Sequence, residues 1–367
     1  MLKVFKKKVS MIELFYDLVF AYMISKATEL IHHLHHGMIS PISFLIFAVV
    51  VIIFINSWMI QTVFTNRYGK SSWTDIGFYF TGMMILLYMS NTFSSANITN
   101  LRKLFLAAAL LSFTLALQYL VVWFKSSNEI DKKIATFFTV ILLIRTFFLV
   151  MGGLINGMTG FIVAIIGVLL GWILPSFTGV YTKKHPIIFS HLLERLTLLI
   201  IITFGETIIG ISDYFQENTF SIYSIIIFVI VATLFFTYIT EFDHLINEYQ
   251  DQQTGNLLIY LHYFILFGLS LITVSLKFIS EPTNLLTAAS GLYLGLTLFY
   301  IGVLIANYYN PTTFKIYFKN IFLIFCILAI GFIISLLFNN FATIAITTAI
   351  VTTLIAAIYV HILIKNN

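Results

Sequence analysis

The sequence predicts an all-α fold, a polytopic bundle of about twelve transmembrane helices. Of its 367 residues, 60% are hydrophobic and 10% are charged, and the mean hydropathy is +0.99. A soluble domain carries about 25% charged residues, so lipid is the solvent that suits this composition. The long continuous apolar runs exclude a membrane β-barrel, whose strands alternate in polarity over about ten residues.

Twelve apolar runs are long enough to cross a membrane, because a helix needs about 20 mostly apolar residues to do so. In chain order they are 11–32, 40–65, 73–92, 103–124, 133–151, 154–175, 189–211, 220–241, 256–278, 286–306, 316–337 and 341–363. The first run contains Glu13, Asp17 and Lys26 and no small-residue cleavage site, so we interpret it as a retained helix rather than a signal peptide. The fifth and sixth runs are separated only by a short glycine-rich break.

The basic residues predict the orientation of the chain. With a cytoplasmic N-terminus, 14 of the 20 Lys and Arg residues fall in inner loops and tails, three in outer loops and three inside spans. This asymmetry favours an even number of spans with both termini in the cytoplasm. The basic residues lie at segment ends and do not gather on one face, so we expect a lipid bilayer as partner and no nucleic acid.

The runs also divide into two sets of six, which predicts an N-terminal half at 1–185 and a C-terminal half at 186–367. A shift of 181 residues places Glu13 on Glu194 and Tyr79 on Tyr260, and the apolar runs then match one for one. Two halves with an even number of spans share one orientation, as parallel repeats do. The residue matches are few and compatible with chance, so the repeat rests mainly on segment lengths.

Charged residues inside the apolar runs are the main functional signal. Glu13 and Asp17 are four residues apart, so they project from one helix face. Two carboxylates on one face repel each other unless a cation or a shared proton relieves them. The run 189–211 offers the cation, because His191, Arg195 and Glu206 fall within about 60° of one another on its surface.

Depth in the membrane predicts two polar layers. The inner layer joins Glu13, Asp17 and Arg195, and the outer layer joins Glu206 with Arg145. Intramembrane charges usually face the bundle interior, and here they are either structural salt bridges or part of a substrate or proton path. Outside these layers, we expect Lys26 to form a local ion pair with Glu29, three residues later, near the outer surface.

Two motifs carry a resemblance to a known family. E-L-F-Y-D-L-V-F at 13–20, together with H-L-L-E-R at 191–195 and F-G-E-T-I at 204–208, is similar to the low temperature requirement protein A family of bacterial membrane proteins. The resemblance implies a multi-pass protein of the bacterial cytoplasmic membrane that is linked to growth in the cold, and it assigns no reaction. The signature positions that it implies are Glu13, Asp17, Glu194, Arg195, Gly205 and Glu206. The sequence departs from the expected Leu at Phe204.

Other polar residues are weaker candidates. Asn56 and His262 lie inside apolar runs, where a polar side chain is more often a helix–helix hydrogen bond than a ligand. The H-H-L-H-H-G segment at 32–37 lacks an accompanying Cys or carboxylate cluster, so we expect interfacial histidines and no metal site. We expect no cofactor, and we expect the acidic segment 240–256 to be a solvated inner loop.

These observations favour a secondary transporter driven by a proton or ion gradient. Asp17 and Glu206 are the preferred titrating groups, and Arg195 or Arg145 is the preferred partner of an anionic small-molecule substrate. Two alternatives remain open: a membrane enzyme acting on a lipid or lipid-linked substrate, and a non-transporting envelope protein for cold adaptation. The chain has no P-loop, G-x-S-x-G or H-E-x-x-H pattern.

Overall fold

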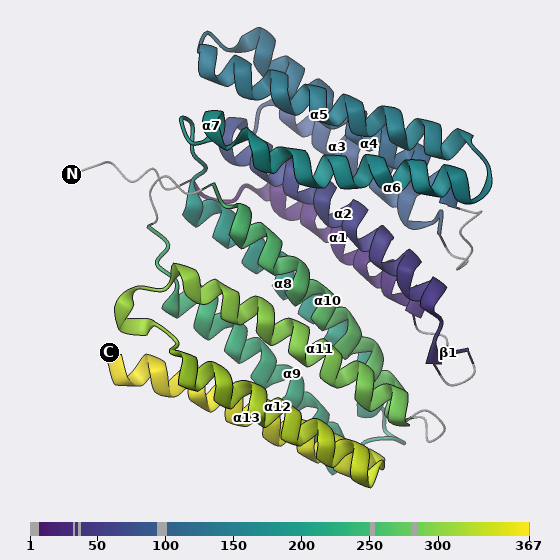
Figure 1. Cartoon of the computed structure of the whole chain (residues 1–367), viewed down its shortest axis with the longest axis vertical. Helices are drawn as coiled ribbons and strands as arrows, with labels where there is room; N and C mark the ends of the chain where they lie inside the picture. The colour runs from purple at the N-terminus through teal and green to yellow at the C-terminus, as the bar shows by residue number, and fades with distance from the viewer. Residues whose placement is uncertain are drawn as a thin grey trace. The chain divides into compact units, whose positions relative to one another are not determined.

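The computed structural model describes residues 7–31, 34–35, 38–93, 101–249, 254–280 and 285–366 (Figure 1). The α-helices are α1 (Met11–Thr28), α2 (Pro41–Tyr68), α3 (Trp73–Ser90), α4 (Arg102–Lys125), α5 (Glu129–Leu154), α6 (Gly157–Ile173), α7 (Gly179–Thr182), α8 (Phe189–Gly210), α9 (Ile222–Ile239), α10 (Asn256–Phe278), α11 (Leu285–Ala306), α12 (Phe318–Phe338) and α13 (Phe341–Asn366). A π-helical segment, η5 (Thr240–Leu245), continues α9. Two short strands, β1 (Leu34–His35) and β2 (Met38–Ile39), pair antiparallel.

Local capping sequences explain where several helices begin. At α3, the Ser72 hydroxyl accepts a hydrogen bond from the Asp75 amide at 3.3 Å, and the Asp75 carboxylate accepts one from the Ser72 amide at 3.0 Å. At α5, the Asn128 side chain accepts from the Ile130 amide at 2.9 Å. Such caps satisfy backbone N–H groups that have no partner in the first turn, so the loops between the apolar runs define the helix ends.

Within the described residues, nine helical segments are long and apolar enough to cross a membrane. They contain α2, α4, α5, α6, α9, α10, α11, α12 and α13. This composition supports a multi-pass membrane protein. The helices that fall short are α1, α3 and α8, and two of these carry the charged candidates. Twelve crossings therefore stay a prediction, although all twelve apolar runs coincide with helices.

The chain forms two compact units. The first unit comprises Met1–His33, Ser40–Arg195 and Tyr249–Leu257, and the second comprises Leu34–Ile39, Leu196–Glu248 and Leu258–Asn367. The boundary falls inside α8, whose first turns belong to the first unit. The expected halves, 1–185 and 186–367, stay a prediction.

In the first unit, α4 and α5 lie side by side and α6 packs on α5 (Figure 1). Helix α1 packs on α2 and α3, α3 packs on α4, and α2 contacts α4 and α6. One aromatic cluster of this core includes Phe64 of α2, Tyr119 of α4 and Phe138 of α5, and the last two rings stack at 4.8 Å. The unit thus encloses α2. In an apolar stretch of 18 residues of this helix, 72% is buried.

In the second unit, α12 packs on α11 and α13, and α13 packs on α9. Phe204 of α8 and Phe235 of α9 lie 5.1 Å apart by ring centroid. The Thr207 and Thr273 hydroxyls join α8 to α10 at 2.7 Å. Helix α10 in turn meets α11, since a Cβ at Gly268 would lie 2.7 Å from the Gly295 carbonyl oxygen.

Candidate functional site

The start of α1 positions the two N-terminal carboxylates. The Glu13 carboxylate accepts hydrogen bonds from the Ser10 amide at 2.8 Å and the Ser10 hydroxyl at 2.7 Å. This is one side of a capping box, so the same local motif that starts the helix also fixes Glu13. Asp17 follows one turn later on the same face. The Glu13 side chain is 1% exposed and that of Asp17 is 0% exposed.

Arg195 joins both carboxylates. Its Nη1 donates to Glu13 Oε1 at 3.1 Å, and its Nη2 donates to Asp17 Oδ1 at 2.5 Å. The guanidinium is itself fully buried. A planar fork of N–H donors suits two separate carboxylates better than a single ammonium would. The structure therefore brings together the three residues of the expected inner layer, and all of them belong to the first unit.

Trp58 of α2 completes the environment of Asp17. Its indole Nε1 donates to Asp17 Oδ1 at 2.7 Å, so this oxygen accepts from both the indole and the guanidinium. The Arg195 Cζ lies 5.1 Å from the centroid of the Trp58 ring, within the range of a cation–π contact. The remaining carboxylate oxygen, Oδ2, is buried and has no hydrogen-bond partner in the part of the chain that the structure describes.

His191 is held on the other side of Glu13. Asn66 accepts from the Ile188 amide at 2.8 Å and donates to the Ile188 carbonyl at 2.9 Å, which sets the orientation of its carboxamide. Its NH₂ group therefore faces His191 Nδ1 at 3.1 Å as a donor. The single proton of a neutral imidazole then lies on Nε2, which is 3.3 Å from Glu13 Oε1.

The cluster of Glu13, Asp17, His191 and Arg195 carries a net charge of −1 when both carboxylates are ionised and His191 is neutral. A buried charge without a counter-charge costs several kcal/mol or more. One bound proton would bring the cluster to neutrality. Asp17 Oδ2 is the position where that proton would break none of the hydrogen bonds described above.

Lys7, just before α1, lies close to the cluster. Its ammonium donates to the backbone carbonyls of Thr65, Asn66 and Gly69 at the C-terminal end of α2, where a cation complements the helix dipole. Burial lowers the pKa of Lys7, and the neighbouring Glu13 and Asp75 carboxylates oppose part of that shift. The Lys7 ammonium is thus hydrogen-bonded to the C-terminal end of α2, and the Glu13 and Asp75 carboxylates both lie near it.

The residues of the expected outer layer belong to different units. Arg145 of α5 is 0% exposed, and it donates to Asn56 Oδ1 at 2.7 Å and to Ser57 Oγ at 3.1 Å. Glu206 of α8 lies in the second unit and is half-buried. The pairing of Glu206 with Arg145 stays a prediction. Glu194 is exposed on α8, outside the cluster.

The two weaker polar candidates form hydrogen bonds between helices. Asn56 of α2 binds Arg145 of α5, as described above. His262 of α10 is fully buried, and its Nδ1 lies 2.6 Å from the Leu258 carbonyl oxygen, to which it donates. Its Nε2 then accepts from the Tyr238 hydroxyl of α9 at 3.1 Å. Lys26 pairs locally with Glu29 at 2.8 Å, as the sequence predicted.

The sequence missed one residue of the site, one of its interpretations needs correction, and another concerns residues outside the described ranges. Trp58, the missed residue, is buried in the middle of α2. Its signal was an indole N–H in an apolar run, which needs an acceptor. Segment 240–256 is not wholly solvated, because Glu241 is 0% exposed in η5. Of the 32–37 segment, His32, His33, His36 and Gly37 lie outside the described residues.

The first unit also contains a pocket. Its charged lining residues are Arg67, Lys70, Asp75, Lys125, Asp131 and His185. Arg67 Nε donates to the His185 carbonyl at 3.1 Å, and its buried Nη1 has no partner among the described residues. Asp75 is the same carboxylate that lies near Lys7. Polar groups therefore lead from this pocket through Lys7 to Glu13.

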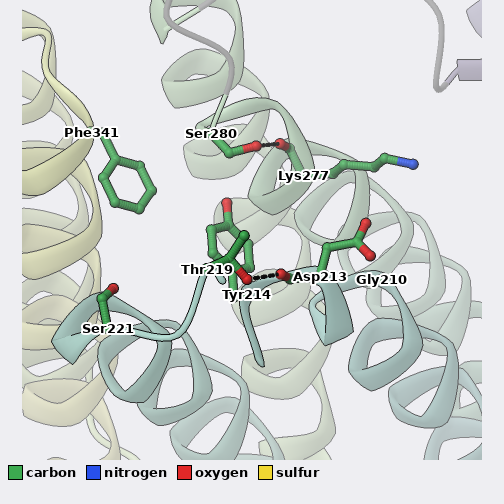
Figure 2. Close-up of a pocket in the computed structure, with 8 residues that line it drawn as sticks. All are labelled: Gly210, Asp213, Tyr214, Thr219, Ser221, Lys277, Ser280 and Phe341. Carbon is green, nitrogen blue, oxygen red and sulfur yellow. Dashed lines mark hydrogen bonds between the residues drawn. The ribbon is translucent and has the colours of Figure 1, made fainter. Parts of the chain in front are cut away.

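A second pocket belongs to the other unit (Figure 2). Asp213, Tyr214 and Lys277 line it, with Phe341 of α13 on the opposite wall. The Tyr214 hydroxyl donates to the Leu276 carbonyl at 2.5 Å, and burial raises the pKa of Tyr214 to about 12. Tyr214 is therefore a neutral hydrogen-bonding group at physiological pH. This pocket lies far along α8 from Arg195, by fifteen helical residues to Gly210.

Comparison with known proteins identifies the family. A family model described as bacterial low temperature requirement A protein matches residues 8–357. No curated protein and no solved structure matches the chain significantly. The match spans both compact units and includes every residue of the buried cluster. The resemblance expected from the two acidic motifs is confirmed, and the chain belongs to the bacterial low temperature requirement A family of multi-pass membrane proteins.

Proposed function

We propose that the protein is a proton-coupled secondary transporter in which Asp17 binds the proton and Arg195 binds an anionic substrate. The observation that carries this proposal is the buried cluster around Arg195, in which two carboxylates share one guanidinium. The unpartnered Asp17 Oδ2 is the atom that would accept the proton. A purely structural pair would need one carboxylate for one guanidinium, whereas this cluster has two.

Charge balance couples the two ligands. Binding a monovalent anion to the unprotonated cluster would take its net charge from −1 to −2. If a proton binds to Asp17 at the same time, the net charge stays at −1. Protonation also weakens the hold of Asp17 on Arg195 Nη2, which then becomes available to the anion. The anion and the proton therefore bind more tightly together than apart, which is the linkage that a symporter requires.

Helix α8 provides the connection to the rest of the molecule. Arg195 is its last residue in the first unit, and Leu196 is its first in the second. A change in the hydrogen bonds of Arg195 therefore acts directly on a helix that both units share. In transporters with repeated halves, such a bias on one helix shifts the equilibrium between inward- and outward-facing states. The pocket that contains Arg67 supplies cations on the predicted cytoplasmic side.

The first test measures proton binding without a substrate, with Trp58 as the reporter. A variant with Trp73, Trp123 and Trp172 changed to Phe retains only Trp58. Protonation of Asp17 alters a charge and a hydrogen bond at the indole, so we expect the emission of Trp58 to titrate with pH. Asp17→Asn should abolish this titration. Asp243→Asn, which changes a side chain that is 68% exposed, should retain it.

The second test measures transport in proteoliposomes on a solid-supported membrane, with a panel of small carboxylates and inorganic phosphate. We expect at least one anion to evoke a proton-coupled current, which Asp17→Asn reduces at least tenfold and Asp243→Asn leaves within twofold. A wild-type current that survives Asp17→Asn would contradict the proposal. So would conversion of a lipid substrate in detergent, where no gradient exists, because that result indicates an enzyme.

A further inference from the structure

Glu241 is a buried carboxyl group that the proposed transport site does not use. It lies in η5, where the Ile246 amide donates to the Glu241 carbonyl at 3.0 Å, five residues back. Such π-helical turns are rare and occur mostly at functional sites, because one extra residue per turn shifts the following side chains. Here the shift places Glu241 inside, while Asp243 and His244 on the same segment are 68% and 52% exposed.

The surroundings of Glu241 belong entirely to the second unit. Segment η5 packs against α9, α11 and α13. The Asn310 carboxamide lies beside the Glu241 carboxyl group, and Tyr359 of α13 lies close by, next to Tyr300 of α11. The nearby cation is Lys315.

Asn310 and Lys315 stabilise a negative charge on Glu241 less than burial destabilises it. Neither carboxyl oxygen of Glu241 has a hydrogen-bond partner of normal geometry within the described ranges. Lys315 Nζ is held by the backbone carbonyls of Asn307 at 2.6 Å and Tyr308 at 3.1 Å. On α9, the Tyr238 hydroxyl is engaged with His262. An isolated buried carboxylate of this kind is far more costly than its neutral form.

The same surroundings do satisfy a protonated carboxyl group. Asn310 Oδ1 and the hydroxyl oxygen of Tyr359 are buried and likewise have no partner in the described residues. A neutral carboxyl group donates one hydrogen bond, and each of these oxygens can accept one. A single proton on Glu241 thus removes the charge and also supplies a donor to a site that otherwise consists of unpartnered oxygens.

We propose that Glu241 is a second proton-binding site, which holds its proton at neutral pH and exchanges it through the exposed end of η5. The site lies in a different unit from Asp17. The proposal for Glu241 is therefore independent of the transport proposal. A metal cation such as sodium is the competing occupant of a group of oxygens, and the positive charge of Lys315 disfavours it.

Infrared difference spectroscopy of the purified full chain in lipid tests this proposal. We expect wild-type protein at neutral pH to show the carbonyl band of a protonated carboxyl group, which Glu241→Gln removes by the equivalent of one group. The band should decrease when the pH is raised, and it should not respond to sodium at constant pH. Glu217→Gln, which changes an exposed side chain, is the matched control and should retain the band.

Stability provides the second measurement. Glutamine has the shape of a neutral glutamate, so Glu241→Gln should fold and should melt within a few degrees of the wild type. If Glu241 were instead ionised and paired with Lys315, Glu241→Gln would leave the band unchanged and would melt much lower. Either observation overturns the proposal. Loss of the wild-type band on sodium addition at constant pH also overturns it, in favour of a metal cation.

Discussion

At the scale of single residues, Asn66 has a central position because it connects two helices and a histidine tautomer. Its carboxamide satisfies both backbone groups of Ile188, at the start of α8, and directs a donor at His191. An Asp at this position would accept from the Ile188 amide but would give His191 a negative charge to face. The hydrogen bond that Asn66 donates to His191 Nδ1 would be lost.

Lys7 provides a prediction about pH. Burial lowers its pKa in the folded protein, so the unfolded chain binds this proton more tightly. The contribution of Lys7 to the free energy of unfolding therefore increases as the pH rises from the lowered pKa towards the ordinary value of about 10.4. We expect the melting temperature of the wild type, relative to Lys7→Met, to rise between neutral pH and about pH 10.

The control for this measurement is Lys8→Met, because Lys8 is the exposed neighbour of Lys7. Its melting temperature, compared with that of the wild type, should show no such trend over the same pH range. If the difference between the wild type and Lys7→Met were constant or fell as the pH rose, Lys7 would not carry a lowered pKa.

The sequence predicted the charged part of the site and missed its uncharged part. Glu13, Asp17 and Arg195 could be found because a charge in an apolar run is costly, and therefore signals a partner. Trp58 could not be found this way, because an indole contributes to the apolar run that hides it. Glu241 was missed because E-F-D-H at 241–244 looks like a hydrophilic loop, and only the π-helical turn reveals which of its acids faces inward.

At the scale of helices, the lengths of the apolar runs predicted the positions of the helices well. The run 256–278 coincides with α10 (Asn256–Phe278), and the run 341–363 begins with α13 (Phe341–Asn366). Apolar length is a local property of the chain, so it can be counted from the sequence. The choice of neighbours is not local. It depends on small residues that let two backbones approach, and their partners lie many residues away.

Helices α10 and α11 offer a test of this close approach. A Cβ at Gly268 would lie 2.6 Å from the Phe299 amide nitrogen and 2.7 Å from the Gly295 carbonyl oxygen. Both are backbone atoms, which cannot rotate away as a flexible side chain can. We expect Gly268→Ala to lower the free energy of unfolding by about 1–3 kcal/mol through overpacking, measured as a fall in melting temperature in detergent.

Gly77→Ala is the matched change in α3, because a Cβ there would meet nothing within 4 Å. Alanine is the better helix former by about 1 kcal/mol, so this variant should melt at or above the wild-type temperature. Equal melting temperatures for the two variants would show that α10 and α11 are not packed backbone to backbone.

At the scale of the whole molecule, six helix pairs of the first unit have an equivalent pair in the second, although the contact of α2 with α4 has none. In the first, α1 packs on α2 and α3, α3 on α4, α5 on α4 and α6, and α2 on α6. In the second, α8 packs on α9 and α10, α10 on α11, α12 on α11 and α13, and α9 on α13. The order of helices along the chain is the same in both. This correspondence supports the parallel repeat as a proposal more strongly than the few matching residues do.

Parallel repeats require equivalent loops to face the same side of the membrane. The chain has one native cysteine, Cys326, so Cys326→Ser provides a background for single-cysteine labelling in intact cells. Ser127 and Tyr308 are equivalent under the shift of 181 residues, and both are exposed in links between helices. Asn156 and Asn340 are exposed in the corresponding links at the other ends of the helices.

We expect cysteines at positions 127 and 308 to react with a membrane-impermeant maleimide only after permeabilisation, and cysteines at 156 and 340 to react in intact cells. This pattern follows from twelve crossings with both termini in the cytoplasm, because each half then contains an even number of spans. The comparison within each pair decides the matter. If positions 127 and 308 reacted on opposite sides, one half would contain an odd number of crossings. The parallel repeat would then be excluded.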